Sequence, residues 1–359
     1  MPNRREALLI LNALQEGLSF SKVQKCIQTF GSPESIFEQN MSALAKVTTP
    51  KVAALITQWK EKFDLKAELK QIEQKKVSVV THEDPAFPPA LLNISTPPLL
   101  LYCQGKILPQ DAQAIGIVGS RQATVYGTKT TLMLAQQLGH RGWTIVSGLA
   151  WGIDTHAHLG ALQAQARTLA VIGQGLGTPL FPPDNEALAE KIKENGAILS
   201  EFPMTFAPVP RNFPRRNRII SGMSQAVLVV EAARRSGAFI TADFALEQGK
   251  PVLAVPGPID SKVSEGPNRL IQQGAKCVMG IEDILEELNN EETAGKMPIP
   301  TLSPEEKIIW ERLSNEALQL EQLIEITGLN TIQANQALFA LEIKSLVKPL
   351  PGQYYVKLV

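Results

Sequence analysis

The sequence predicts an α/β protein, with a doubly wound parallel sheet between an N-terminal helical domain and a C-terminal winged helix. Three observations predict this fold class. Short apolar runs alternate with helical stretches between residues 114 and 280, apolar residues recur with helical spacing before residue 77, and three helical patterns followed by a hairpin pattern end the chain. With 359 residues, the chain is long enough for two or three domains.

Residues 1–76 have the pattern of a small helical domain. Apolar side chains follow helical spacing from Leu8 to Phe63. Between them, Gly31, Ser32 and Pro33 are expected to end one helix and begin the next, because glycine terminates helices, serine caps them and proline suits the first turn.

Residues 77–285 are predicted to form the sheet domain. Its proline-rich start, residues 85–98, favours an extended connection, because proline disrupts helices. The expected strands are Ala114–Val118, Trp143–Ser147, Leu169–Gly173, Ala197–Ser200, Ala226–Val230 and Val252–Val255. The expected helices are Tyr126–Arg141, Asp154–Ala166, Asn185–Asn195 and Thr241–Gln248. Such alternation is typical of βαβ units, whose strands are parallel.

The C-terminal part has a different pattern. Residues 286–300 are acidic and end in Pro298-Ile299-Pro300, which predicts a linker. Three helices are expected beyond it, at Pro304–Ser314, Gln319–Thr327 and Ile332–Ser345, followed by a hairpin. Because the turn at residues 327–330 suits a helix-turn-helix, residues 301–359 are predicted to form a winged helix.

The composition favours a globular protein of the cytoplasm. Hydrophobic residues make up 44% of the chain, and no apolar run approaches the ~18 residues that span a membrane. Cys26, Cys103 and Cys277 are too far apart for a zinc or redox CxxC site, so reduced thiols are expected. The 35 basic residues balance 35 acidic ones, which leaves room for a local cationic patch only.

Small and polar residues follow the predicted strands. In a parallel sheet, ligands bind beyond the carboxyl ends of the strands, and glycines there let the backbone approach phosphate. The candidate phosphate-binding residues of this kind are Gly119, Ser120, Arg121, Ser147, Gly148, Ser236 and Gly237. The alternative is that these glycines only form tight turns.

The strongest cationic feature is an arginine cluster at residues 211–218. It contributes Arg211, Arg215, Arg216, Asn217 and Arg218 as candidate phosphate ligands, with no acidic residue among them. Guanidinium groups match phosphate oxygens in pairs, so a chain of phosphates would gain affinity from the cluster. The alternative is a solvated charged surface.

No metal or cofactor is expected. Asp154 and His158 share one face of their predicted helix, but His156 points away from both, so the three side chains cannot converge on a metal. The run Gly173–Gly177 lacks the last glycine of a dinucleotide fingerprint, and the chain has no GxxxxGK[ST] loop.

Several motifs together resemble a known family. They are Gly119–Arg121, Ser147–Gly148, Gly152–Asp154, Phe213–Gly222, Val229–Ala232, Ser236–Gly237 and Ala254–Gly257. Their order and spacing over residues 110–278 resemble the DprA/Smf family of DNA-processing proteins. The resemblance implies an extended Rossmann-like fold, an N-terminal domain of the SAM-like or helix-hairpin-helix type, and a C-terminal winged helix.

The same resemblance implies a function. Members bind single-stranded DNA without known catalysis, protect incoming DNA, form homodimers, and load the recombinase RecA during natural transformation and homologous recombination. By motif, Ser120, Arg121, Arg216, Asn217 and Arg218 would bind phosphate. The loop at residues 175–185 departs from the family, because it carries no Lys or Arg where members often have a basic residue.

Two other functions remain open. Lysine-decarboxylase-like phosphoribohydrolases share the broad fold and cleave nucleoside monophosphates, but their PGGxGTxxE segment with its catalytic glutamate has no counterpart here. The nearest segments, Ser236–Thr241 and Pro256–Pro258, lack both the glycine pair and the glutamate. The other possibility is a nucleotide-binding sensor that acts through its end domains.

For the homodimer, we expect a contact at the sheet edge, within residues 266–275. Leu270 and Ile271 are adjacent, so a helix cannot turn both equally inward, and one of them is predicted to meet a partner chain. The alternative is that both pack under the sheet edge of their own chain.

Overall fold

The computed structural model describes residues 1–14, 17–234, 236–288, 302–313, 318–344, 346–350 and 352–357. The chain divides into two compact units, Met1–Glu291 and Glu292–Val359, and each is described by itself. Most of the predicted linker, from residue 289 onward, lies outside the described residues. The predicted boundary at residue 76 falls inside the first unit, between helix α6 (Leu65–Gln74) and strand β1 (Ser78–Thr81).

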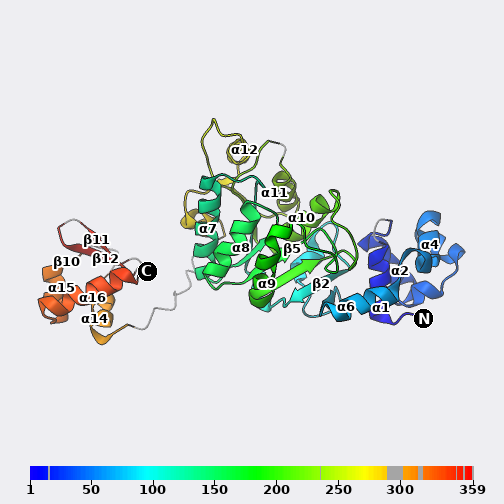
Figure 1. Ribbon diagram of the computed structural model, residues 1–359, viewed down its shortest axis with the longest axis horizontal. Coiled ribbons are helices and arrows are strands. Elements are labelled where there is room, and N and C mark those ends of the chain that lie inside the picture. The colour runs from blue at the N-terminus through cyan, green and yellow to red at the C-terminus, as the bar shows by residue number, and fades with distance from the viewer. Residues whose placement is uncertain are drawn as a thin grey trace. The chain divides into compact units, whose positions relative to one another are not determined.

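A nine-stranded sheet forms the centre of the first unit (Figure 1). The strands lie in the order β1-β2-β6-β5-β4-β3-β7-β8-β9. After β1 they are β2 (Leu100–Gly105), β3 (Ala114–Val118), β4 (Thr144–Ser147), β5 (Thr168–Val171), β6 (Gly196–Ser200), β7 (Ala226–Val229), β8 (Val252–Ala254) and β9 (Lys276–Cys277). The pairs from β6 across to β9 are parallel, which confirms the predicted α/β fold class.

Two strands depart from the parallel arrangement. β1 pairs antiparallel with β2, and β2 pairs antiparallel with β6, where Tyr102 lies opposite Ser200. Parallel neighbours require a crossover, usually a helix. The proline-rich segment between β1 and β2 supplies only a short 3-10 turn, η2 (Pro89–Asn93), so the chain returns in the opposite direction.

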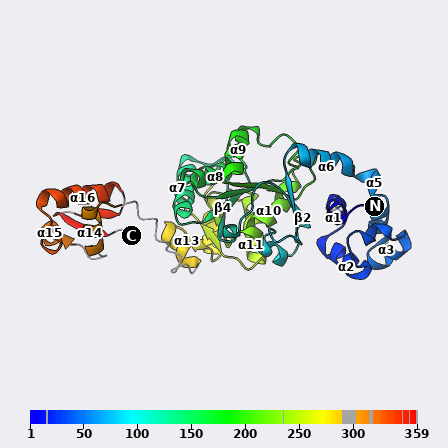
Figure 2. The same ribbon diagram turned by 90° about the horizontal axis from the view of Figure 1, so that it is seen from below.

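Helices cover both faces of the sheet (Figure 2). On one face, α7 (Val125–His140) and α8 (Ile153–Gln163) pack on β3 and β4 through side chains such as Leu138 and Ile145. On the other, α10 (Asn212–Met223) and α11 (Ala238–Glu247) pack through Ile220 and Val227. The remaining helices of this layer structure are α9 (Glu186–Asn195), α12 (Glu265–Gln272) and α13 (Ile281–Glu287).

The strand order places a topological switch point at β3. The chain proceeds from β3 to β4 on one side, whereas β7, reached much later, pairs with β3 on the other. The connections that follow β3 and β7 therefore lie on opposite faces of the sheet. A crevice opens between them at the carboxyl ends of these two strands.

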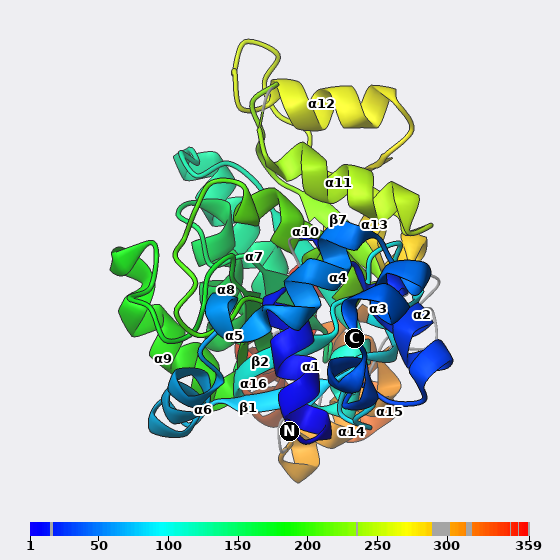
Figure 3. The same cartoon turned by 90° about the vertical axis from the view of Figure 1, so that its right-hand side faces the viewer.

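The N-terminal residues form a helical cluster with its own core, as predicted (Figure 3). Its helices are α1 (Arg4–Ala13), α2 (Phe20–Phe30), η1 (Ser35–Glu38), α3 (Met41–Val47), α4 (Pro50–Thr57) and α5 (Trp59–Lys62), followed by α6. Helix α6 joins this cluster to the sheet, because buried Glu68 accepts hydrogen bonds from Tyr102 Oη at 2.6 Å and from Met204 N at 3.0 Å. Burial raises the pKa of Glu68.

The second unit has the predicted winged-helix pattern. Helices α14 (Pro304–Arg312), α15 (Leu320–Thr327) and α16 (Thr331–Ile343) pack around one apolar core. A three-stranded sheet in the order β10-β12-β11 forms the wing, from β10 (Leu318–Gln319), β11 (Val347–Leu350) and β12 (Tyr354–Lys357). Across the described residues of both units, no helix has the length and hydropathy to cross a membrane.

Candidate functional site

A large crevice opens at the switch point of the sheet. The pocket has a volume of about 1030 Å³ and lies at the carboxyl ends of β3, β4 and β7. Residues from the first turns of three helices line it, with Asp154 from α8, Phe213 from α10 and Ala238 from α11. We call this pocket the crevice. Helix N-termini carry free N–H groups and a positive dipole end, so their convergence favours an anionic ligand.

The first loop brings Arg121 to the crevice. Ser120 N donates a hydrogen bond to Glu231 O at 2.6 Å, and Ser120 Oγ accepts one from Gln122 N at 3.1 Å. A Cβ at Gly119 would lie 2.7 Å from Glu231 O, so only glycine fits this approach of two backbones. Arg121 is exposed, and its guanidinium lies 5.2 Å from the centre of the Phe213 ring.

Arg216 lies deeper, against the second loop. Its Nη1 donates to Gly148 O at 2.7 Å and also to Val171 O, and the side chain is only 4% exposed. A Cβ at Gly148 would lie 2.4 Å from Arg216 Nη2, so glycine is required for this contact. Ser147 is buried behind the crevice and donates to Ile117 O at 2.6 Å. Gly148 therefore supports Arg216, and neither Ser147 nor Gly148 is among the residues that line the crevice.

Burial sets the electrostatics of the crevice wall. It lowers the pKa of Arg216 to about 10, with Arg121 acting in the same direction and Asp154 opposing, so Arg216 stays cationic at neutral pH. Burial also raises the pKa of Asp154, although Arg216 and two backbone N–H groups oppose the shift. Those N–H groups belong to Gly148 and Ala150, which donate to Asp154 Oδ2 at 3.1 and 3.4 Å.

The other arginines of the cluster lie outside the crevice lining. Arg218 is buried and forms a two-pronged ion pair with Glu201, at 2.8 and 2.7 Å. Arg215 reaches the same carboxylate at 3.3 Å and covers the Phe202 ring. Arg211 is exposed at the start of α10. Glu201 supplies the carboxylate that the cluster itself lacks. In the sequence, only its position directly after β6 suggested that it lies near the site.

The third group of candidate residues lies at the start of α11. Ser236 and Gly237 line the crevice, where Ser236 Oγ accepts from Ala238 N at 3.3 Å. Asn217 also lines it and donates to Gly237 O at 3.3 Å. The fold therefore gathers Gly119, Ser120, Arg121, Arg216, Asn217, Ser236 and Gly237 around one crevice.

The sequence patterns missed a set of aromatic residues at the crevice. Trp151, in the loop after β4, packs edge to face against Phe181 with ring centres 5.2 Å apart. The Phe213 ring lies 6.2 Å from Phe181. All three line the crevice. The signal for these rings in the sequence was the presence of Phe181 in the loop at residues 175–185, which has no Lys or Arg.

The histidines of α8 are bound within the protein. His158 is fully buried, with Nδ1 2.6 Å from Thr168 Oγ1, and burial lowers the pKa of His158 to about 3. His156 Nδ1 lies 2.8 Å from Gly152 O. Within the described parts of the chain, no group of His, Cys, Asp and Glu side chains is arranged to hold a metal ion.

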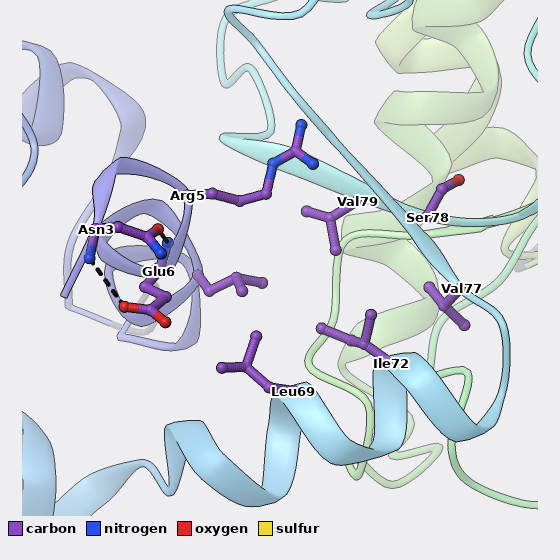
Figure 4. A pocket seen from close by; sticks show the side chains of 9 residues that line it. Asn3, Arg5, Glu6, Leu69, Ile72, Val77, Ser78 and Val79 are labelled. Carbon is purple, nitrogen blue, oxygen red and sulfur yellow. Dashed lines mark hydrogen bonds between the residues drawn. The ribbon is translucent and has the colours of Figure 1, made fainter.

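Two other features lie outside the crevice. On α12, Leu270 is buried in the core, whereas Ile271 is half-buried and packs against that core. A smaller pocket of about 280 Å³ lies between α1, α6 and β1, where the apolar side chains of Leu69, Ile72 and Val79 face the space (Figure 4). None of the predicted site residues lies in this smaller pocket.

Comparison with known proteins identifies the family. Residues 78–289 match the family described as DNA recombination-mediator protein A, and residues 293–353 match the DprA winged helix domain. Protein Smf of Synechocystis sp. is 36% identical over 326 residues, which are 80% of this chain and 82% of that protein. The crystal structure of DNA processing protein A from Streptococcus pneumoniae is 33% identical, with a TM-score of 0.70, and the match covers 80% of this chain and 99% of that one.

A second solved structure also matches, that of DNA processing protein A from Helicobacter pylori, described by its single-stranded DNA binding mode. It is 30% identical, with a TM-score of 0.54, and the match covers 60% of this chain and 98% of that one. The family match covers more than half of this chain, and it agrees with the fold and with the strand-end motifs. The chain therefore belongs to the DNA recombination-mediator protein A (DprA/Smf) family of DNA-processing proteins.

Proposed function

We propose that the protein binds single-stranded DNA through phosphate contacts in the crevice and catalyses no reaction on it. The observation that carries the proposal is the convergence of Arg121, Arg216 and the first residues of α8, α10 and α11 on one crevice. Guanidinium groups and helix N-termini both favour phosphate oxygens. The single-stranded DNA binding described for the Helicobacter pylori relative supports the same ligand.

The chemistry of the crevice supports binding over catalysis. Among the described residues that line it, Asp154 is the one carboxylate, and its Oδ2 accepts hydrogen bonds from two backbone N–H groups. A general base needs an oxygen within reach of substrate. Asp154 is instead used to hold the loop that carries Trp151.

The proposal includes partners. A recombination mediator delivers a recombinase to single-stranded DNA, so we assign RecA as the protein partner and incoming DNA as the strand that is protected. We also assign a homodimer, because two crevices related by a two-fold axis would lengthen the DNA path. Among the described residues of α12, half-buried Ile271 is the candidate dimer contact, since Leu270 already packs in its own core.

Replacement of Arg121 tests the phosphate contacts. Arg121→Ala removes an exposed cation at the crevice, so labelled oligothymidylate should bind more weakly. The loss should shrink as salt rises, because each lost phosphate contact removes one released counterion, and the slope of log K against log salt should fall by about 0.7. Arg141→Ala is the control, because Arg141 lies at the far end of α7 and pairs with Glu282.

The same titration separates the alternatives. Equal binding by wild type and Arg121→Ala at low salt would contradict the assignment of the crevice. Incubation with nucleoside monophosphates should release no free base. Base release that Asp154→Asn abolishes would instead favour the phosphoribohydrolase reaction, and tight monophosphate binding without DNA binding would favour a nucleotide sensor.

A further inference from the structure

We propose that Trp151 and Phe181 form a base-stacking rim beside the phosphate contacts of the crevice, so that the protein binds nucleobases of single-stranded DNA as well as phosphates. We call these two side chains the rim. This inference rests on the proposed function, and it adds a second chemical component to the site. Stacking on aromatic rings is tolerant of sequence, because every base has a flat π-face.

The first observation is exposure. Trp151 is 37% exposed and Phe181 38% exposed, although both are large side chains in direct contact with each other. Their edge-to-face geometry, with an angle of 76° between the ring planes, leaves ring surface uncovered at the mouth of the crevice. Neighbouring exposed aromatic rings at the mouth of a pocket are typical of binding sites.

The second observation is that polar contacts hold the rim in place. Trp151 Nε1 donates to Asp184 Oδ2 at 2.8 Å. Phe181 N donates to Gln174 Oε1 at 2.9 Å, and buried Gln174 also binds Thr178 Oγ1 at 2.8 Å. The ring of Trp151 and the backbone that carries Phe181 are therefore held in place before ligand arrives, which reduces the entropy lost on binding.

The third observation is the position of the rim relative to the cations. Phe213 links the two parts, because its ring lies 6.2 Å from that of Phe181 and under the guanidinium of Arg121. A strand with a phosphate at Arg121 therefore brings its neighbouring bases to the rim. In a duplex, the flat faces of the bases are covered by their neighbours, so the rim favours single strands.

The rim also explains the loop at residues 175–185. This loop has no Lys or Arg, so it adds no phosphate contact from a cationic side chain. It supplies Phe181 to the crevice and Asp184 to orient Trp151. The affinity that the rim contributes should therefore be insensitive to salt, in contrast to that of Arg121.

Two oligonucleotides of equal length test the rim, an oligothymidylate and an abasic strand with the same phosphates. Binding of each to the full chain is measured by fluorescence anisotropy at low and at high salt. Trp151→Ala and Phe181→Ala should each weaken binding of oligothymidylate by about 5- to 100-fold at both salt concentrations. Neither variant should change binding of the abasic strand.

Matched variants control for indirect effects. Trp151→Phe keeps an aromatic ring while losing the bond to Asp184, so it should retain most of the affinity for oligothymidylate. Phe339→Ala removes an exposed phenylalanine from α16 of the second unit and should bind as wild type does. Thermal unfolding of each variant verifies that it is folded.

The outcomes distinguish this proposal from the proposed function. Loss of binding in Arg121→Ala together with wild-type binding in Trp151→Ala and Phe181→Ala would overturn the rim alone. An equal loss on the abasic strand would also overturn it, because bases would then play no part. A wild-type chain that binds neither strand would overturn the proposed function and the rim with it.

Discussion

Arg218 and Arg121 have the same side chain but different environments, and the difference follows from one acid. Glu201 holds Arg218 in a buried pair, whereas Arg121 stays exposed at the crevice. Removing one partner from a buried ion pair leaves an uncompensated charge in a region of low dielectric constant. Arg218 is therefore a structural residue of α10 as well as a member of its cationic sequence cluster.

Replacement of Glu201 tests this assignment. Glu201→Gln should reduce the free energy of unfolding by about 3 to 5 kcal/mol, because Arg218 would remain buried without a counter-charge. Urea denaturation measures the change. Glu190→Gln is the control, since Glu190 is largely exposed and pairs with Lys193 on the surface of α9, where a pair contributes about 0 to 1 kcal/mol. Equal losses in both variants would contradict the structural role of the pair.

At the residue scale, the sequence predicted residue types better than their environments. Gly119 and Arg121, which directly follow β3, were predicted from strand-end chemistry, and both line the crevice. The arginine cluster could not be resolved into separate roles from its spacing. Its partner Glu201 is ten residues or more away, and the pairing depends on how the fold brings the chain after β6 to α10. The rim was missed because its two rings come from loops that meet only in the folded chain.

At the scale of the element, helix α16 has the position of a recognition helix without the charge. Thr331–Ile343 contains no Lys or Arg, and Lys344 at its C-terminal end bonds to Glu306 Oε2 at 2.6 Å. Exposed Ile332 and Phe339 lie on this helix instead. A helix that binds DNA in a groove needs a positive face, so α16 is expected to add little DNA affinity.

Removal of the second unit tests that expectation. A chain that ends after residue 288 keeps the whole described sheet and the crevice. It should bind oligothymidylate with the affinity and salt dependence of the full chain, as measured by anisotropy titration. A large loss of affinity, in a truncated chain that melts as cooperatively as the full one, would assign DNA contacts to the winged helix.

Regular elements were the most predictable part of the fold. The apolar runs from Ala114 to Val255 correspond to six strands, with ends shifted by at most two residues. Such runs are informative because strands buried on both faces need apolar side chains throughout. The antiparallel strands β1 and β2 were not predicted, because their direction depends on pairing with β6 and not on their own composition.

At the scale of the whole molecule, the proposed homodimer contact on α12 can be tested by substitution. Ile271→Glu should convert the proposed homodimer to a folded monomer, because the charge would enter a buried contact. Leu270→Glu should reduce stability instead, since Leu270 is already in the core of its own chain. Sedimentation velocity measures the first effect and thermal unfolding the second.

Ile332→Glu, at an exposed isoleucine of α16, is the control. A folded dimer of Ile271→Glu would place the dimer contact elsewhere.

The loop origin of the rim has a consequence for the divergence of this protein. Trp151 and Phe181 project from connecting loops and are more than a third exposed, whereas Arg216 belongs to a helix and is fixed by backbone carbonyls. Substitutions at the two rings therefore escape the stability constraint that restricts Arg216. Affinity for bases and stability of the fold can accordingly evolve at separate positions. Related chains could gain or lose base stacking at the rim while the phosphate contacts of the crevice stay unchanged.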